Sequence, residues 1–192
     1  SFKILTMDFI YTSIIDRFAD NADVFADNNI GIIKHFDLFR NQYVYPELHL
    51  PYKRPALFYQ YQVNWKSRGG AQIQEGDVQI RLHIELENYG QSFGHSANRD
   101  YALEIFKYHT VVYALCQGFS TSKFTPLNRI SNEPDETPAQ TNVHIITFET
   151  KILDDTAQQL IDSGKIKQPL DDMTTTEKPL PVQEETESKY VI

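Results

Sequence analysis

A serine, a histidine and an aspartate near the middle of the chain have the residue types of a hydrolase triad. Ser92, His95 and Asp100 lie within nine residues of one another, and a nucleophilic serine needs a base and an orienting carboxylate. However, Ser92 lacks the G-x-S-x-G turn that exposes such a nucleophile, and all three types are common in loops and caps. We therefore expect a loop followed by a helix start. The functional alternative to this structural interpretation is a small cytosolic enzyme whose active site lies in the loop over residues 88–100.

The only cysteine, Cys116, is a second candidate nucleophile. His109 precedes it by two helical turns, so about 10 Å of helical rise separates the two residues. A Cys–His pair must be in hydrogen-bonding contact, and we therefore expect Cys116 to be a small core residue. A single cysteine also excludes an intramolecular disulfide and a cysteine-based zinc site.

The sequence His83-Ile84-Glu85 has the H-x-E spacing of zinc deaminases. That chemistry also requires a P-C-x-x-C pair of ligands, which a chain with one cysteine cannot supply. Residues i and i+2 of a strand share one face, so we expect His83 and Glu85 to form an exposed polar pair. No catalytic residue, metal ligand or cofactor is predicted.

Gly69 and Gly70 follow Arg68 between two strand-like segments. The glycines lack the G-x-G-x-x-G or P-loop context that binds phosphate. They are typical of a mobile hairpin tip, which is either an ordinary flexible loop or a surface that contacts a partner.

The acidic residues are concentrated in the C-terminal segment. The chain has 192 residues and a net charge of −8. Residues 154–192 hold nine acidic and four basic residues, so this segment carries five of the eight net negative charges. Nucleic-acid surfaces need clustered Lys and Arg, so we expect no sequence-specific nucleic-acid binding. No apolar stretch has the length needed to span a bilayer, and we expect no membrane partner.

The elements that position these residues are most regular between residues 56 and 154. Apolar residues alternate with polar ones from Leu57 to Trp65 and from Val78 to Leu86, which predicts an antiparallel hairpin with an extended tip. Apolar spacings of three and four predict one long helix over Ala97–Phe119, with Gly118 near its end.

The remaining segments have weaker patterns. Pro46, Pro51 and Pro55 exclude regular structure before the first strand of the hairpin. The other predicted elements are a helix over Met7–Phe18, a short strand or irregular arm over Ile32–Tyr45, a short strand over Leu127–Ile130, a polar loop over Ser131–Thr141, an internal strand over Val143–Leu153 and a short helix over Thr156–Ser163.

These elements predict an α+β fold: a four-stranded, mostly antiparallel sheet with the long helix packed on one face. Residues 1–55 form an N-terminal helix and arm, residues 56–154 the core domain, and residues 155–192 a short helix and an extended acidic tail. The tail cannot bury a core and should be flexible in isolation. It is either a solvated appendage or a docking arm, and we expect the arm.

Function is therefore expected in partner contacts at the periphery of the domain. The segments left for this role are the hairpin tip, the loop over Asn88–Ser96, the sheet edges and the acidic tail. The predicted partner-binding residues are Arg68, Gly69, Gly70, Gln91, Phe93, Glu184 and Glu185.

The order of elements resembles the tail terminator (tail completion) proteins of long-tailed bacteriophages. The resemblance extends over residues 7–154 and is one of architecture, because this family has no invariant chemical signature. The matching segments are Arg54–Tyr59, Val78–Glu87, Tyr101–Phe119, Asn128–Asp135 and Asn142–Leu153.

The resemblance implies a structural, non-enzymatic virion protein that is assembled in the host bacterial cytoplasm. It would form a ring, commonly a homohexamer, that terminates the tail tube and meets a head-side connector or stopper protein. The arm through Pro55 and the tail after Asp155 exceed the compact family pattern. The alternatives are therefore another neck connector or stopper protein and a bacterial binding module unrelated to phage.

Overall fold

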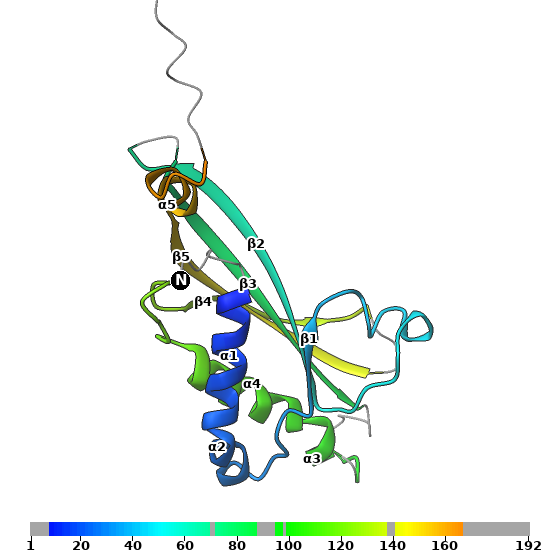
Figure 1. The fold of residues 1–192 in the computed structure, drawn as a ribbon. Coiled ribbons are helices and arrows are strands. Elements are labelled where there is room, and N and C mark those ends of the chain that lie inside the picture. The colour runs from blue at the N-terminus through cyan, green and yellow to red at the C-terminus, as the bar shows by residue number, and fades with distance from the viewer. Residues whose placement is uncertain (1–7, 70–71, 88–94, 98, 138–140, 167–192) are drawn as a thin grey trace, which may run out of the picture.

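The protein is built around one five-stranded sheet with helices on one face. A computed structural model describes residues 8–69, 72–87, 95–97, 99–137 and 141–166, and its strand order is β1-β2-β3-β5-β4 (Figure 1). The strands are β1 (His35–Leu38), β2 (Ala56–Ser67), β3 (Gln74–Glu87), β4 (Asn128–Asp135) and β5 (Thr141–Asp154). The helices are α1 (Asp8–Asp20), α2 (Ala22–Asp27), α3 (Arg99–Ala102), α4 (Glu104–Cys116) and α5 (Thr156–Asp162), with a 3-10 turn at Pro46–Leu48.

The predicted antiparallel hairpin is confirmed as β2 and β3. The pairing runs without a register shift from Ala56 opposite Glu85 to Ser67 opposite Gln74. β5 pairs with β3 on one side and with β4 on the other, which confirms that the last strand is internal. Alternation of apolar residues predicts these strands well because each has one face in the main core.

The predicted four-stranded, mostly antiparallel sheet is wrong in one strand. β1 is a fifth strand that runs parallel to β2 and pairs His35 with Ala56 and Leu38 with Tyr59. It lies in the segment Ile32–Tyr45, whose sequence allows either a short strand or an irregular arm. Its side chains are only partly buried, so its pairing depends on the neighbouring β2 more than on a local apolar pattern.

The single helix predicted over Ala97–Phe119 is divided into α3 and α4. Leu103 (φ −89°, ψ −6°) lies at the interruption, and α4 ends at Cys116 because Gln117 is extended. Gly118 has φ +75°, which favours glycine, and its amide donates to the Leu127 carbonyl. The chain thereby turns from the helix toward β4.

The polar loop predicted over Ser131–Thr141 is wrong at its start, because β4 extends to Asp135. Nearly all side chains of β4 are exposed, so an apolar period cannot reveal this strand. Pairing with β5 creates it, with a bulge between Arg129 and Ser131 and a proline at Pro134. Such features are typical of an edge strand.

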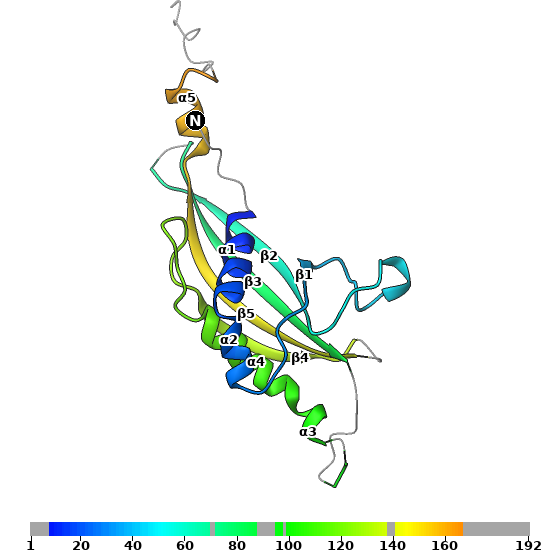
Figure 2. The ribbon, with the colours of Figure 1, turned by 60° about the horizontal axis from the view of Figure 1, so that its bottom comes forward.

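The main core lies between the sheet and the helices α1, α2 and α4 (Figure 2). The middle strand, β3, contributes alternate residues from Val78 to Leu86 to this core. The helices bury Phe9, Ile10, Ile14, Phe18, Phe25, Ile105, Tyr108, Val111, Val112, Leu115 and Cys116 against it. Among the described residues, no helix has the length and apolar character needed to cross a membrane.

The opposite face of the sheet has a cover over only part of its length. The arm between β1 and β2 packs Phe39, Tyr43 and Tyr52 on Phe58 and Val143. From Gln60 toward the hairpin tip, the side chains of β2 are half-buried or exposed. The three strands β2, β3 and β5 therefore project beyond α1, α2, α4 and the arm, toward α5 at their far end (Figure 1).

Candidate functional site

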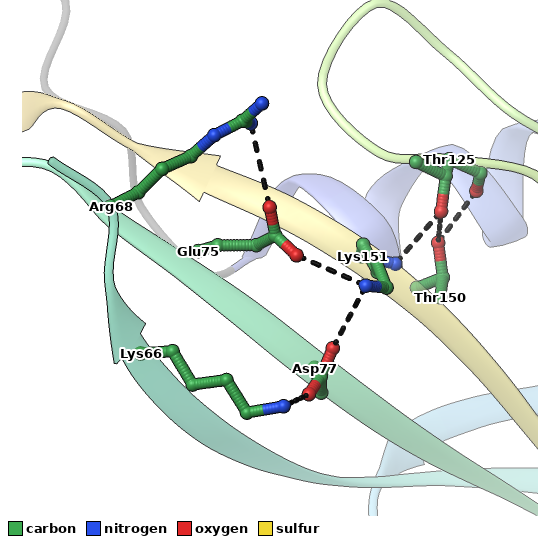
Figure 3. Close-up of polar contacts among 7 residues, drawn as sticks. All are labelled: Lys66, Arg68, Glu75, Asp77, Thr125, Thr150 and Lys151. Carbon is green, nitrogen blue, oxygen red and sulfur yellow. Dashed lines mark hydrogen bonds and ion pairs between the residues drawn. The ribbon is translucent and has the colours of Figure 1, made fainter.

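Five charged side chains form a continuous network on the projecting part of the sheet, which we call the charged ladder. It consists of Lys66, Arg68, Glu75, Asp77 and Lys151 from the ends of β2, β3 and β5 (Figure 3). The two outer ion pairs join Lys66 to Asp77 (2.5 Å) and Arg68 to Glu75 (3.4 Å). The Lys151 amine connects both acids, at 3.0 Å from Glu75 and 3.6 Å from Asp77.

The charges of the ladder stabilise one another. A hydrogen bond from Lys66 lowers the pKa of Asp77, and a hydrogen bond to Glu75 raises the pKa of Lys151. The side chains are nevertheless well exposed, for example 69% for Lys66 and 65% for Arg68. Exposed ion pairs contribute only about 0–1 kcal/mol each, so the ladder organises a polar surface more than it stabilises the fold.

The loop between α4 and β4 joins this surface at the edge of β5. The Thr125 amide donates to the Lys151 carbonyl (2.9 Å), and the Lys151 amide donates to Oγ1 of Thr125 (2.8 Å). The Thr150 hydroxyl donates to the Thr125 carbonyl at 2.6 Å. These bonds place Lys123, whose amine lies 5.4 Å from the centre of the Phe9 aromatic ring, beside the ladder.

A shallow pocket of about 360 Å³ lies between this loop and the ladder. Its charged lining residues are Arg68, Lys123, Lys151 and Glu75, so cations outnumber carboxylates three to one. The rest of the lining consists of the serine and threonine residues of the segment Ser120–Thr125 and of the apolar residues Phe124, Pro126, Ile152 and Leu153. The arrangement is suited to binding acidic or hydrogen-bonding groups of a partner.

The predicted partner-binding residues are only partly described by the structure. Arg68 belongs to the charged ladder, and Gly69 is exposed with φ +72° and with no atom within 4 Å of the position that a Cβ would take. Position 69 thus favours glycine because of its positive φ, and not because a side chain would meet a neighbouring atom. The other five predicted residues, Gly70, Gln91, Phe93, Glu184 and Glu185, lie outside the described residues.

The two predicted contact segments are at opposite ends of β3. The ladder surrounds the beginning of β3, near Gln74, whereas the segment 88–94 follows its last residue, Glu87. The 14 residues of β3 span about 45 Å. The two ends of this strand therefore do not form one site, and a partner that bound at both would have to be very extended.

The expectation that His83 and Glu85 are an exposed pair is wrong. Their side chains do share the polar face of β3, but the arm before β2 covers them, and the residues are 2% and 0% exposed. Nδ1 of His83 lies 2.6 Å from the Tyr43 hydroxyl, and the Phe39 aromatic ring stacks on the imidazole at 4.2 Å. Alternation predicts the face of a residue, but not whether another segment covers that face.

The protonation states within this buried group follow from its surroundings. Burial, aided by the nearby charge of Arg81, lowers the pKa of His83 to about 4. Burial opposes the ionisation of Asp135, but hydrogen bonds from Thr137 and Tyr43 outweigh it and lower the pKa of this carboxyl. The Tyr43 hydroxyl donates to Asp135 (2.7 Å) and lies 2.6 Å from Nδ1 of neutral His83, whose Nε2 lies 3.1 Å from Oε1 of Gln60.

Glu85 is held by a second set of partners from the arm. The Tyr52 hydroxyl donates to one carboxylate oxygen at 2.7 Å, and Nε of Arg54 donates to the other at 2.8 Å. A buried carboxylate requires such partners. His83 and Glu85 thus have a structural explanation, in which they attach the arm to the sheet.

The remaining candidates for chemistry are not assembled into a site by the described residues. Cys116 is buried, as we predicted, and burial raises the pKa of its thiol to about 12, away from nucleophilic activation. His95 and Asp100 are exposed, and Ser92 is outside the described residues. Within the described ranges, no three His, Cys, Asp or Glu residues are grouped so that they could hold a metal ion.

Sequence reasoning missed the residues that the loops contribute. Lys123 and Thr125 follow a helix in a segment without a period, and Tyr43 and Tyr52 lie in an arm interrupted by prolines. The one available signal was the high frequency of aromatic residues in this arm, which indicates burial against another surface.

Compared with known proteins, the chain matches no family model and no curated protein significantly.

Proposed function

We propose that this protein is a structural component of a phage or phage-like particle. It forms a ring, most simply a homohexamer, at the head–tail junction, where it terminates the tail tube and joins it to the head connector. The proposal starts from the resemblance in element order over residues 7–154. The comparisons with known proteins add no support, and the exposed surfaces of the chain supply the rest.

The observation that carries the proposal is the projecting part of the sheet. β2, β3 and β5 extend past α1, α2, α4 and the arm (Figure 1), and most side chains of β2 from Tyr61 to Ser67 are exposed. One face carries the charged ladder, and the other exposes Tyr61 (45%) and Trp65 (39%). A domain that worked alone would gain little from this extension, whereas a subunit of an assembly uses it to contact neighbours.

The separation of the two ends of β3 further supports a connecting role. A protein between the tail tube and the head must meet one partner on each side. The ladder at the start of β3 and the other end of the strand, at Glu87, provide two distant places for such contacts. Head-to-tail contacts between copies bury different patches on each subunit, and they close into a ring when the rotation from one subunit to the next divides a full turn.

The test is the mass of the protein in solution, alone and mixed with the tail tube protein of the same particle. Light scattering and electron microscopy should show rings, or rings that cap tubes, and tube length should no longer grow. A protein that stays monomeric and never caps tubes would refute the proposal. In that case, a binding module or an enzyme would be the better explanation.

A charge reversal links the test to the charged ladder. Lys151→Glu places a carboxylate beside Glu75 and Asp77, which should disrupt the ladder and weaken ring formation or tube capping. Lys107→Glu makes the same charge change at an exposed position of α4 and serves as the matched control. Equal assembly of both variants would remove the ladder from the proposed contacts.

A further inference from the structure

We propose that the outer edge of β2 pairs with the same edge of a second copy of this chain. The two β2 strands would run antiparallel about a two-fold axis that passes beside Val63. The proposal does not depend on the proposed ring, because a two-fold contact uses the same patch twice and does not propagate around a ring.

From Gln60 to Lys66, no strand in the described part of the chain pairs with this edge. β1 pairs only with Ala56–Tyr59, and the Phe39 amide donates to the Tyr59 carbonyl at 2.8 Å. β2 continues to Ser67 with β3 on its other side. In Figure 1 no strand lies on the free side of β2 beyond β1, and α5 lies near the hairpin tip.

The residues that direct their backbone N–H and C=O groups outward from this edge are the ones that this pairing requires. The carbonyls of Pro55 and Tyr59 accept from residues of the β1 segment, so the odd-numbered residues direct their backbone groups away from β3. By strand alternation, Tyr61, Val63 and Trp65 do the same. A two-fold axis at Val63 places Val63 opposite its own copy and Tyr61 opposite Trp65 of the second copy, so that every pair joins outward-directed groups.

The side chains are compatible with the same register. Tyr61, Val63 and Trp65 lie on the helix-bearing face, where Tyr61 contacts Tyr59 (5.8 Å between aromatic rings) and where Val63 and Trp65 lie over Gly76. In the pair, these residues of the two copies would form one apolar row. Aromatic and β-branched residues are favourable cross-strand neighbours, and the row would cover the exposed parts of Tyr61 and Trp65.

The polar face of β2 also avoids charge repulsion in this register. Lys66 would lie opposite Gln60 of the second copy, and Gln62 opposite Asn64. The two copies of Lys66, the only charged residue between Gln60 and Lys66, would be at opposite ends of the paired segment. Like charges directly opposite each other would destabilise the pair, and this register has none.

The other edge of the sheet is a poorer candidate. β4 has a bulge after Arg129 and a proline at position 134, and both features hinder the addition of a strand. Between Gln60 and Ser67, β2 has neither a bulge nor a proline nor a glycine. The observations therefore favour β2 with β2 over a contact between the two different edges.

A cross-link at the axis tests the register. In the proposed pair the two Val63 Cα atoms are about 5.5 Å apart, so Val63→Cys should be joined by a short bis-maleimide. Ser67→Cys is the matched control on the same edge, because its two copies would be about 27 Å apart. The native Cys116 is buried with a raised thiol pKa and should not react in the folded protein.

The expected result is several-fold more cross-linked dimer for Val63→Cys than for Ser67→Cys. Both thiols must first react with a mono-maleimide at similar rates. Equal or absent cross-linking of the two variants would overturn the proposal, since it would indicate random collision, another register or an edge that stays unpaired.

Trp65 provides a second readout that needs no substitution, because it is the only tryptophan. Pairing covers its indole, so its emission should shift to shorter wavelength as the protein concentration rises. An emission wavelength that stays the same at all protein concentrations would contradict self-association.

Removal of residues 1–7 serves as a further comparison for the cross-linking experiment. If these residues covered the edge of β2, only the shortened chain would give the cross-link, and the proposal for the full chain would fail.

Discussion

The hydroxyl of Tyr43 lies 2.6 Å from Nδ1 of His83, although forty residues separate them in the chain. Tyr43 belongs to the arm before β2 and His83 to the middle strand of the sheet. The same hydroxyl is 2.7 Å from Asp135 at the end of β4. One side chain thus joins the arm, the centre of the sheet and the edge strand, which leads to predictions about stability and pH.

Removal of the Tyr43 hydroxyl should destabilise the protein. Tyr43→Phe keeps the aromatic packing but leaves His83 and Asp135 without a shared partner, at a cost of about 1–3 kcal/mol in the free energy of unfolding. Denaturant titration measures this loss. Tyr45→Phe in the same arm is the control, because Tyr45 is 51% exposed and should change stability by less than about 0.5 kcal/mol. Similar effects of both variants would contradict the proposed role of the network.

Stability should fall as the pH decreases below neutrality. The pKa of His83 is about 4 in the folded protein and about 6.5 in the unfolded chain. The unfolded state therefore takes up a proton first, and the stability present above about pH 6.5 is lost as the pH approaches 4. At pH 5 the loss should reach about 2 kcal/mol.

His83→Gln separates this contribution from that of the carboxylates. Glutamine cannot take up a proton, so the variant should lose less stability between pH 7 and pH 5 than the original protein. Chemical denaturation at both pH values gives the comparison. Parallel pH profiles would show that His83 is not the responsible group.

The buried carboxylate of Glu85 should make Arg54 important for folding. Arg54→Met leaves Glu85, which is 0% exposed, with Tyr52 as its remaining hydrogen-bond donor, and the cost should be about 3 kcal/mol or more. The double variant Arg54→Met with Glu85→Gln has no unpaired buried charge and should recover part of this loss. A double-mutant cycle by denaturant unfolding measures the coupling. Additive losses would mean that the two side chains do not interact.

A methyl group at Gly76 should disturb the projecting sheet. Its Cβ would lie 2.8 Å from Val63, 2.9 Å from Trp65 and 3.0 Å from Ile152, so Gly76→Ala should cost about 1–3 kcal/mol and change the emission of Trp65. In the control Gly31→Ala, the nearest atom is the Tyr108 hydroxyl at 3.4 Å, and the effect should be smaller. An unchanged Trp65 emission in Gly76→Ala would show that the strands move apart easily.

The sequence predicted the elements whose side chains alternate between core and solvent. The pairing of Leu57 to Trp65 with Val78 to Leu86 was readable, because one face of each strand is apolar and the connection contains glycines. The helix stripe was also readable from Ile105 to Leu115. By contrast, β4 has almost no buried side chain, and β1 has only four residues, so neither leaves a periodic signal.

The candidate site was predicted in its location and not in its composition. Arg68 and Gly69 follow from a glycine-rich connection between two strands. Lys151 and Lys123 enter the same surface from β5 and from the loop after α4. Their approach depends on strand order and on the hydrogen bonds of Thr125, which no local pattern specifies.

By itself, the sequence determined which strands form the hairpin, which face of each strand enters the main core, and where chain turns occur, because these depend on side-chain period and on glycine conformation. Only the tertiary structure decided the fate of the polar face. It covered His83 and Glu85 with Tyr43, Tyr52 and Arg54, and it left the charged ladder exposed. The reason is physical: a polar side chain is stable in water or beside a buried partner, and only the path of the rest of the chain selects between the two.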